Sequence, residues 1–168
     1  MNTFPRVPPR LDRLFPHNPV FFVTASTHLR KRLLANTSLH DAFIAFAVRA
    51  YSDHNIAVGR YVIMPDHIHL FVCGPEDFEL GRWMGGLKQH LQKAIIGREA
   101  KELRAASPTG RRLQTPIWQR GFFDHVLRND ESYGQKWNYV RDNPVRAAFV
   151  GNADDWPYAG EIIQIDRV

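Results

Sequence analysis

Four segments of the chain are rich in β-branched and aromatic residues and are bounded by residues that favour turns. This composition is typical of β-strands, because branched and aromatic side chains pack well on a pleated surface. The predicted strands are 20–27, 56–64, 67–73 and 122–128. Pro65 and Asp66 separate the second strand from the third. Since proline cannot donate to a strand ladder and aspartate favours turns, these two strands are expected to form a hairpin.

Three other segments repeat apolar residues at helical spacing, which predicts amphipathic helices. The first runs from about 37 to 52, with Thr37 or Ser38 as its cap, and the second begins at Leu80 and continues to about Ile95. The third follows a cap at Asn129 and runs to about Asn143, because Pro144 is expected to stop it. The basic stretch 97–116 is interpreted as a mobile loop that leaves room for a helical extension.

The order strand, helix, strand, strand, helix, strand, helix is that of a split βαβ arrangement. We therefore predict an α+β fold of the ferredoxin-like or RRM-like kind, with an antiparallel sheet and helices packed on one face. The other face would be free to hold nucleic acid. One domain over 1–168 is expected, with an irregular lead-in over about 1–18 and a tail over about 151–168.

Composition narrows the class of protein further. The 168 residues are 44% hydrophobic and 23% charged, which is ordinary for a globular chain. No apolar run approaches the roughly 18 residues of a membrane span, and the first residues lack the apolar core of a signal peptide. A cytoplasmic protein without membrane contact is expected. The single cysteine, Cys73, excludes an internal disulfide and a multi-cysteine zinc cage.

A net charge of +5 and a pI near 9.7 favour a polyanionic partner. The positive charge is concentrated late in the chain. The clustered cations are Arg98, Lys101, Arg104, Arg111 and Arg112, with Arg120 and Arg128 following. We take Arg111, Arg112, Arg120, Arg128, His125, Lys88 and Arg146 as candidate DNA contacts.

His67-Ile68-His69 is the first candidate site. Residues two apart in a strand point to the same face, so the two imidazoles leave one face while Ile68 points to the other. Side chains placed in this way can converge on one metal ion. The competing interpretation is a pair of surface histidines without a shared ligand, which is the common outcome for an arbitrary His-x-His.

Tyr139 and Asn143 are four residues apart in the third predicted helix and therefore share a face. The amide oxygen can complete a metal shell with the two imidazoles, and this ligand set suits Mn²⁺ or Mg²⁺ better than a closed zinc site. With a metal polarising a phosphate, a tyrosine can act as the nucleophile and conserve the energy of the phosphodiester, so no ATP is needed. Considered alone, Tyr139 is more typical of an amphipathic tyrosine that packs its ring on the core and places its hydroxyl at the surface.

The segment 117–128 interleaves aromatic residues with arginine. Phe123, His125 and Leu127 share one face of the predicted strand. In one interpretation this strand stacks bases and pairs phosphates. In the other it is a buried strand whose histidine is hydrogen-bonded within the protein, and the residues leave both interpretations open.

Together these segments resemble the single-tyrosine histidine–hydrophobic–histidine (HUH) transposases of the IS200-like type. The resemblance covers roughly 20–158 and rests on four motifs in order: the hairpin 61–72, the elements Trp118-Gln119, Asp124-His125 and Arg128, the helix segment 139–147, and the tail Asp155-Trp156-Pro157-Tyr158. The tail motif resembles that of the REP-associated tyrosine transposase branch.

The resemblance implies that His67 and His69 are metal ligands, with Asn143 as the third. It implies that Tyr139 forms a 5′-phosphotyrosine and releases a 3′-hydroxyl. The implied substrate is single-stranded DNA beside a hairpin, such as a repetitive extragenic palindrome (REP), and the implied assembly is a monomer or a homodimer. Two alternatives are a hairpin-binding protein that has lost catalysis, for DNA or RNA, and a metal-dependent phosphohydrolase that uses water.

Overall fold

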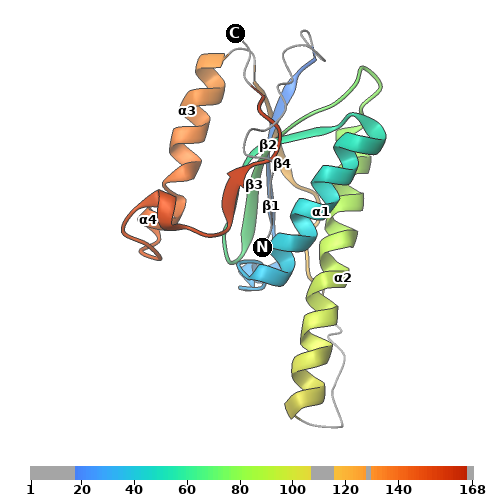
Figure 1. The fold of residues 1–168 in the computed structure, drawn as a ribbon, viewed down its shortest axis with the longest axis vertical. Helices are drawn as coiled ribbons and strands as arrows, with labels where there is room; N and C mark the ends of the chain where they lie inside the picture. The colour runs from blue at the N-terminus through green and yellow to red at the C-terminus, as the bar shows by residue number, and fades with distance from the viewer. Residues whose placement is uncertain (1–17, 107–115, 128–129, 166–168) are drawn as a thin grey trace.

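The computed structural model describes residues 18–106, 116–127 and 130–165. The chain folds into five strands and four α-helices within these residues, with two short 3-10 turns (Figure 1). In chain order the elements are β1 Val20–Ser26, η1 His28–Arg30, α1 Thr37–His54, β2 Ala57–Ile63, β3 His67–Cys73, α2 Leu80–Ala106, β4 Phe123–Leu127, α3 Asp130–Arg141, α4 Asn143–Arg146, η2 Ala153–Asp155 and β5 Ala159–Glu161.

The strands form one antiparallel sheet in the order β4-β1-β3-β2-β5. The predicted hairpin joins β2 to β3, and β1 and β3 lie side by side in the middle of the sheet, with Thr24 opposite His69. The α+β class and the antiparallel sheet predicted from the sequence are confirmed.

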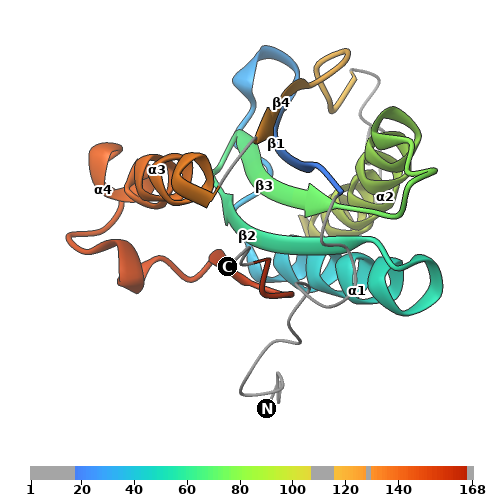
Figure 2. The ribbon, with the colours of Figure 1, turned by 90° about the horizontal axis from the view of Figure 1, so that it is seen from above.

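Helices α1 and α2 cover one face of the sheet, as the sequence predicted (Figure 2). Their apolar stripes meet alternate residues of the strands: the ring of Phe43 on α1 lies 4.7 Å from that of Tyr61 on β2. Met84, Leu87 and Leu91 of α2 are almost completely buried. This layer is the hydrophobic core of the protein.

The helix α3 lies on the opposite face, with α4 following it (Figure 2). Its Tyr133 and Trp137 rings lie 4.5 and 6.4 Å from the ring of Phe71 on β3. Gly59 allows this close approach, because a Cβ there would lie 3.0 Å from the Tyr133 hydroxyl. The expectation of helices on one face therefore holds for α1 and α2, whereas α3 partly covers the face that was expected to be open.

The strand bounds agree with the prediction to within one residue, whereas the helix boundaries differ more. The cap of α1 is Asn36, whose side chain accepts from the Leu39 backbone N–H at 3.0 Å, and not Thr37 or Ser38. Helix α2 continues to Ala106 through part of the predicted loop; residues 107–115 and the expected cap Asn129 lie outside the described residues.

The last helix ends earlier than predicted, at Arg141. Pro144 does not stop it but lies in the first turn of the separate helix α4, where a missing backbone N–H costs nothing. The tail also contains a strand, β5, that pairs with β2 and is followed by buried Ile162, Ile163 and Ile165. These short elements were missed because three residues carry too little periodicity to be recognised.

Candidate active site

The two histidines leave β3 on the face that α3 shares. Ile68 between them is 1% exposed and points into the core beneath α1 and α2. The rings of His67 and His69 lie 4.7 Å apart and nearly perpendicular. The sequence-predicted pairing of these two side chains is therefore present in the structure.

Each histidine is held through its Nδ1 atom. His67 Nδ1 lies 2.6 Å from the Asp66 carboxylate, and His69 Nδ1 lies 2.8 Å from the Thr24 hydroxyl. A hydrogen bond at one ring nitrogen fixes the ring and leaves the other nitrogen for a ligand. Both Nε2 atoms are therefore the ones available for a metal ion.

Burial lowers the pKa of both imidazoles. The pKa of His69 falls to about 3, first because the ring is buried and then because His67 and Arg30 lie nearby. For His67 burial again lowers the pKa, against an opposing pull from Asp66. Neutral imidazoles are the form that binds metal, so these two residues fit a divalent ion at neutral pH.

Within the described residues, a third protein ligand beside the histidine pair is not another histidine, acidic or sulfur group. Among the residues that the structure describes, no group of three or more histidine, cysteine, aspartate or glutamate side chains gathers in one place. An amide oxygen, as predicted for Asn143, is the type of donor that remains consistent with this arrangement.

Asp66 also binds Arg30, a residue that the sequence did not single out. The guanidinium lies 3.1 Å from the Asp66 carboxylate and donates to the Ser26 hydroxyl at 2.9 Å. Leu29 and Arg30 both have a positive φ, near 55°, which is uncommon for side chains of this kind. This backbone turn brings a cation beside the histidine pair.

Tyr139 lies near the end of α3, where its side chain is 65% exposed. The Arg146 guanidinium lies 4.4 Å from the centre of its ring and donates to the Tyr139 carbonyl at 2.7 Å. The same guanidinium donates to the Asn143 amide oxygen. One arginine thus joins the predicted nucleophile to the predicted third ligand across the break between α3 and α4.

Lys136 connects this helix to the histidines. Its ammonium lies 5.2 Å from the centre of the Phe22 ring, and Phe22 in turn stacks on His69 at 5.5 Å. Lys136 and Arg146 both contribute to the lowered pKa of His69, which places their charges within its electrostatic reach. Tyr139 lies one helical turn after Lys136, so the tyrosine and the histidines belong to one region of the surface.

The predicted DNA contacts occupy several environments. Arg120, which precedes β4, and His125, which lies on it, are both exposed. Arg146 is the residue that bridges Tyr139 and Asn143. Arg111, Arg112 and Arg128 lie outside the described residues.

Lys88 has a different setting from the other predicted contacts. It donates to the backbone carbonyls of Gln119, at 3.1 Å, and of Gly121. Burial lowers its pKa, and Gly121 has a φ of 71° that favours glycine. Lys88 therefore holds the turn that leads into β4.

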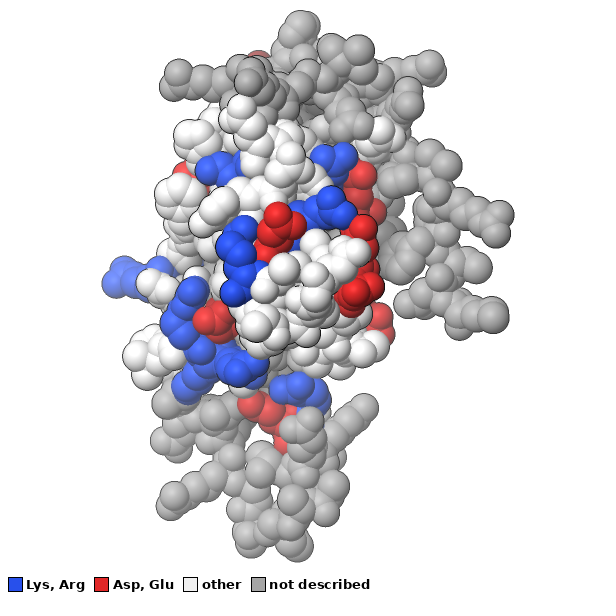
Figure 3. Space-filling model, turned by 90° about the vertical axis from the view of Figure 1, so that its left-hand side faces the viewer, with Lys and Arg blue, Asp and Glu red and all other residues white. Residues whose placement is uncertain are grey.

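The face that α3 and α4 present carries lysine and arginine side chains in several places, with acidic side chains among them (Figure 3). In the part of the chain that the structure describes, no helix is long and apolar enough to cross a bilayer. The charge distribution is that of a surface that can meet a polyanion without being uniformly basic.

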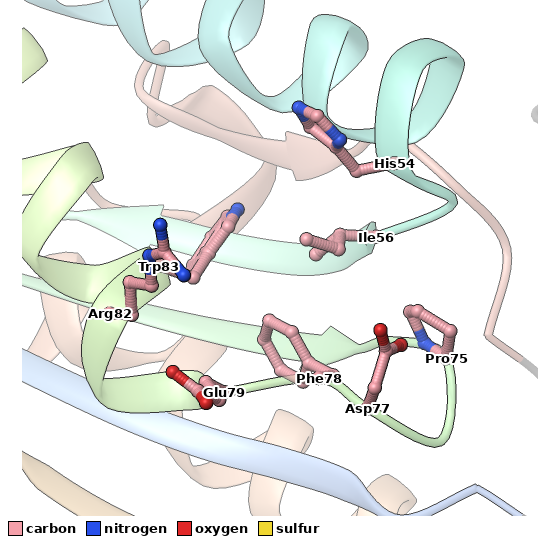
Figure 4. A pocket seen from close by; sticks show the side chains of 8 residues that line it. All are labelled: His54, Ile56, Pro75, Asp77, Phe78, Glu79, Arg82 and Trp83. Carbon is pink, nitrogen blue, oxygen red and sulfur yellow. The ribbon is translucent and has the colours of Figure 1, made fainter.

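A hollow of about 620 Å³ opens at the other end of the sheet, where β3 ends and α2 begins (Figure 4). Its lining residues are His54, Ile56, Pro75, Asp77, Phe78, Glu79, Arg82 and Trp83. Two carboxylates beside one arginine make it a poor phosphate site, and none of the predicted site residues lines it.

A histidine pair on a sheet and an exposed tyrosine on the following helix are the arrangement expected of the HUH, single-tyrosine class. Residues 21–143 match the family model described as "Transposase IS200 like". The chain belongs to this family of IS200-like transposases.

Named relatives agree with this assignment. The chain is 32% identical over 99 residues to a Haemophilus influenzae protein classed with the REP-associated tyrosine transposases, covering 58% of this chain and 54% of the relative. It is 25% identical over 142 residues to the REP-associated tyrosine transposase of Escherichia coli, covering 83% and 73%. The chain thus spans about half the length of the first relative and about three quarters of the second.

A solved structure of a REP-associated tyrosine transposase bound to a REP hairpin has a similar fold. The TM-score is 0.60 at 21% identity, over 84% of this chain and 75% of that one. At this identity the match establishes the shared fold alone.

Proposed function

We propose that this protein nicks and rejoins single-stranded DNA beside a hairpin, with a divalent metal ion and Tyr139 as nucleophile. The observation that carries the proposal is the pair His67 and His69, each fixed through Nδ1, on the same surface as the joined residues Tyr139, Arg146 and Asn143. REP-type palindromes are the proposed hairpins, because the named relatives are REP-associated tyrosine transposases.

His67, His69 and Asn143 are the proposed ligands of Mg²⁺ or Mn²⁺. A bound ion of this kind polarises the scissile phosphate and stabilises the charge that develops on it. The Asn143 oxygen accepts one hydrogen bond from Arg146, and since an amide oxygen has two lone pairs, one remains for a ligand. Arg146 then orients both Asn143 and Tyr139.

The proposed reaction conserves the phosphodiester energy. The Tyr139 hydroxyl gives its proton to solvent and its oxygen attacks phosphorus, forming a tyrosine O–P bond while the bond from phosphorus to the 3′ oxygen breaks. The leaving 3′ oxygen takes a proton and becomes a 3′-hydroxyl, and the 5′ phosphate remains on Tyr139. Attack by a 3′-hydroxyl reverses these steps, so joining needs no ATP.

Two other activities would use the same fold. A hairpin-binding protein without catalysis would not require the tyrosine and the histidines to lie on one surface. A phosphohydrolase with two metals needs additional carboxylate ligands, and the described residues hold no such cluster. The arrangement therefore favours the tyrosine nucleophile.

A covalent-adduct assay separates the three activities. Wild type, Tyr139→Phe and the double variant His67→Ala/His69→Ala are incubated with labelled hairpin DNA from the protein's own genomic neighbourhood, with and without Mn²⁺. On a denaturing gel the proposal predicts a shifted band only for the wild-type protein, and only when Mn²⁺ is present with the DNA. Binding without an adduct would indicate the non-catalytic protein, and cleavage that survives Tyr139→Phe would indicate the hydrolase.

A further inference from the structure

Phe123 and His69 lie in one row of side chains across the sheet. In the register of β4 with β1, Phe123 is opposite Thr24, and in the register of β1 with β3, Thr24 is opposite His69. Opposed residues of antiparallel strands point to the same face. Phe123 therefore stands on the face of the histidine pair, two strand spacings or about 10 Å from His69.

The Phe123 side chain is 59% exposed at this position. In the next row of the same face His125, Phe22 and Phe71 are in register; α3 packs Tyr133 on Phe71, while His125 on the edge strand is exposed. Phe123 itself lies on β4, an edge strand of the sheet, whereas Thr24 and His69 of its row are partly buried. Lone exposed aromatics are common, but this one is aligned with a proposed metal ligand.

The charges around this row suit a nucleic-acid strand. Arg30, Lys136 and Arg146 lie near the histidines and can meet phosphates. The carboxylate next to Phe123, Asp124, is opposite Val23 and points to the other face, so it does not oppose a strand here. The row thus combines an aromatic surface with nearby cations, which is the arrangement that binds single strands.

We propose that Phe123 stacks a nucleobase of the strand whose phosphate lies at His67 and His69. The proposal rests on the proposed function and adds a base-binding position to it. A nucleotide beside the scissile phosphate can span the distance from the histidines to the ring. Because every base has a π-face, stacking on Phe123 would position the strand with little preference for sequence.

The test measures binding without chemistry, in a Tyr139→Phe background. The probes are a short labelled oligothymidylate and an abasic strand of the same length, compared by fluorescence anisotropy at fixed salt. Phe123→Ala should weaken binding of oligothymidylate about 5- to 150-fold and leave abasic binding unchanged. Phe123→Trp should still bind oligothymidylate more tightly than the abasic strand, because tryptophan also stacks bases. Val126→Ala, on the same strand but the other face and 41% exposed, is the matched control.

Equal losses on both probes, or no loss on either, would overturn the proposal. A Phe123→Ala protein that changes from dimer to monomer in sedimentation, with DNA binding unchanged, would instead assign Phe123 to an interface between copies. Failure of the proposed function is recognised separately. Wild type that forms no adduct counts against nicking, whereas the difference between the two probes still decides the role of Phe123.

Discussion

Arg146 covers the ring of Tyr139 and binds the backbone carbonyl of the same residue, at 4.4 and 2.7 Å. Through its third contact, to the Asn143 amide oxygen, it ties the proposed nucleophile to a proposed ligand. The two residues lie on either side of a helix break, so their relative position depends on this arginine more than on continuous helical geometry.

Replacing Arg146 by alanine should lower the rate of adduct formation at saturating hairpin DNA by about 10- to 100-fold, the usual cost of losing a group that orients ligands. Arg146→Lys should not restore the rate, because an ammonium lacks the planar fork that reaches two acceptors. Arg141→Ala is the matched control, since Arg141 ends α3 and pairs with Asp154 of η2. If Arg146→Ala forms the adduct as fast as wild type, Arg146 does not position the catalytic groups.

Metal affinity should depend on the partners of the histidines. Asp66→Ala and Thr24→Val each remove the group that fixes a ring through Nδ1, and each should weaken Mn²⁺ binding by about 10- to 100-fold. Calorimetric titration of Mn²⁺ without DNA measures this directly. Asp124→Asn, an exposed carboxylate on the other face, should bind as wild type does. Unchanged affinity in both site variants would show that the rings need no support.

Replacing Lys88 tests whether its role is structural or whether it contacts DNA. Lys88→Met loses two hydrogen bonds to the turn before β4 and should lower the free energy of unfolding by about 1–3 kcal/mol. Urea unfolding tests this, with Lys93→Met, exposed on the same helix, as control. A smaller salt dependence of DNA binding with no change in unfolding would instead favour the phosphate contact predicted from the sequence.

Acid should destabilise the protein through His40. Its Nε2 lies 2.8 Å from the Tyr61 hydroxyl, and burial lowers its pKa. Since the folded pKa lies below the unfolded value of about 6.5, the unfolded chain binds more protons, and this stability is lost as pH falls below 6.5. Between pH 7 and 5, His40→Gln should lose less unfolding free energy than wild type. The exposed His54→Gln is the control; equal pH slopes in all three proteins would contradict this role of His40.

The sequence predicted β3 to the residue, because Pro65-Asp66 and Gly74-Pro75 bound a run whose alternation also predicted where His67 and His69 point. The sequence also singled out Tyr139 and Asn143 as candidates, although the shared helix assumed for them is broken at Asp142. Such features are local, because hydrophobic periodicity and turn-forming residues can be recognised within a single segment of the sequence.

The features that the sequence did not reveal depend on distant partners. Thr24 supports His69 from 45 residues away in the sequence. Arg30 reaches the site through a left-handed turn, and neither Leu29 nor Arg30 is a residue type that indicates such a turn. Asp66 was recognised only as a turn former, although its position directly before His67 was a usable signal. Lys88 was expected on DNA because its charge is visible in the sequence, whereas its contacts with the 119–121 turn are not.

The central claim is that Tyr139 becomes covalently joined to DNA, and mapping the adduct tests it most directly. Wild-type protein is incubated with Mn²⁺ and hairpin DNA, the DNA is trimmed with nuclease, and the peptides are sequenced by mass spectrometry. The account predicts a nucleotide joined through its 5′ phosphate to the Tyr139 oxygen, and no such peptide from Tyr139→Phe or from His67→Ala/His69→Ala. A nucleotide on another residue, or an adduct that persists in Tyr139→Phe, would contradict it.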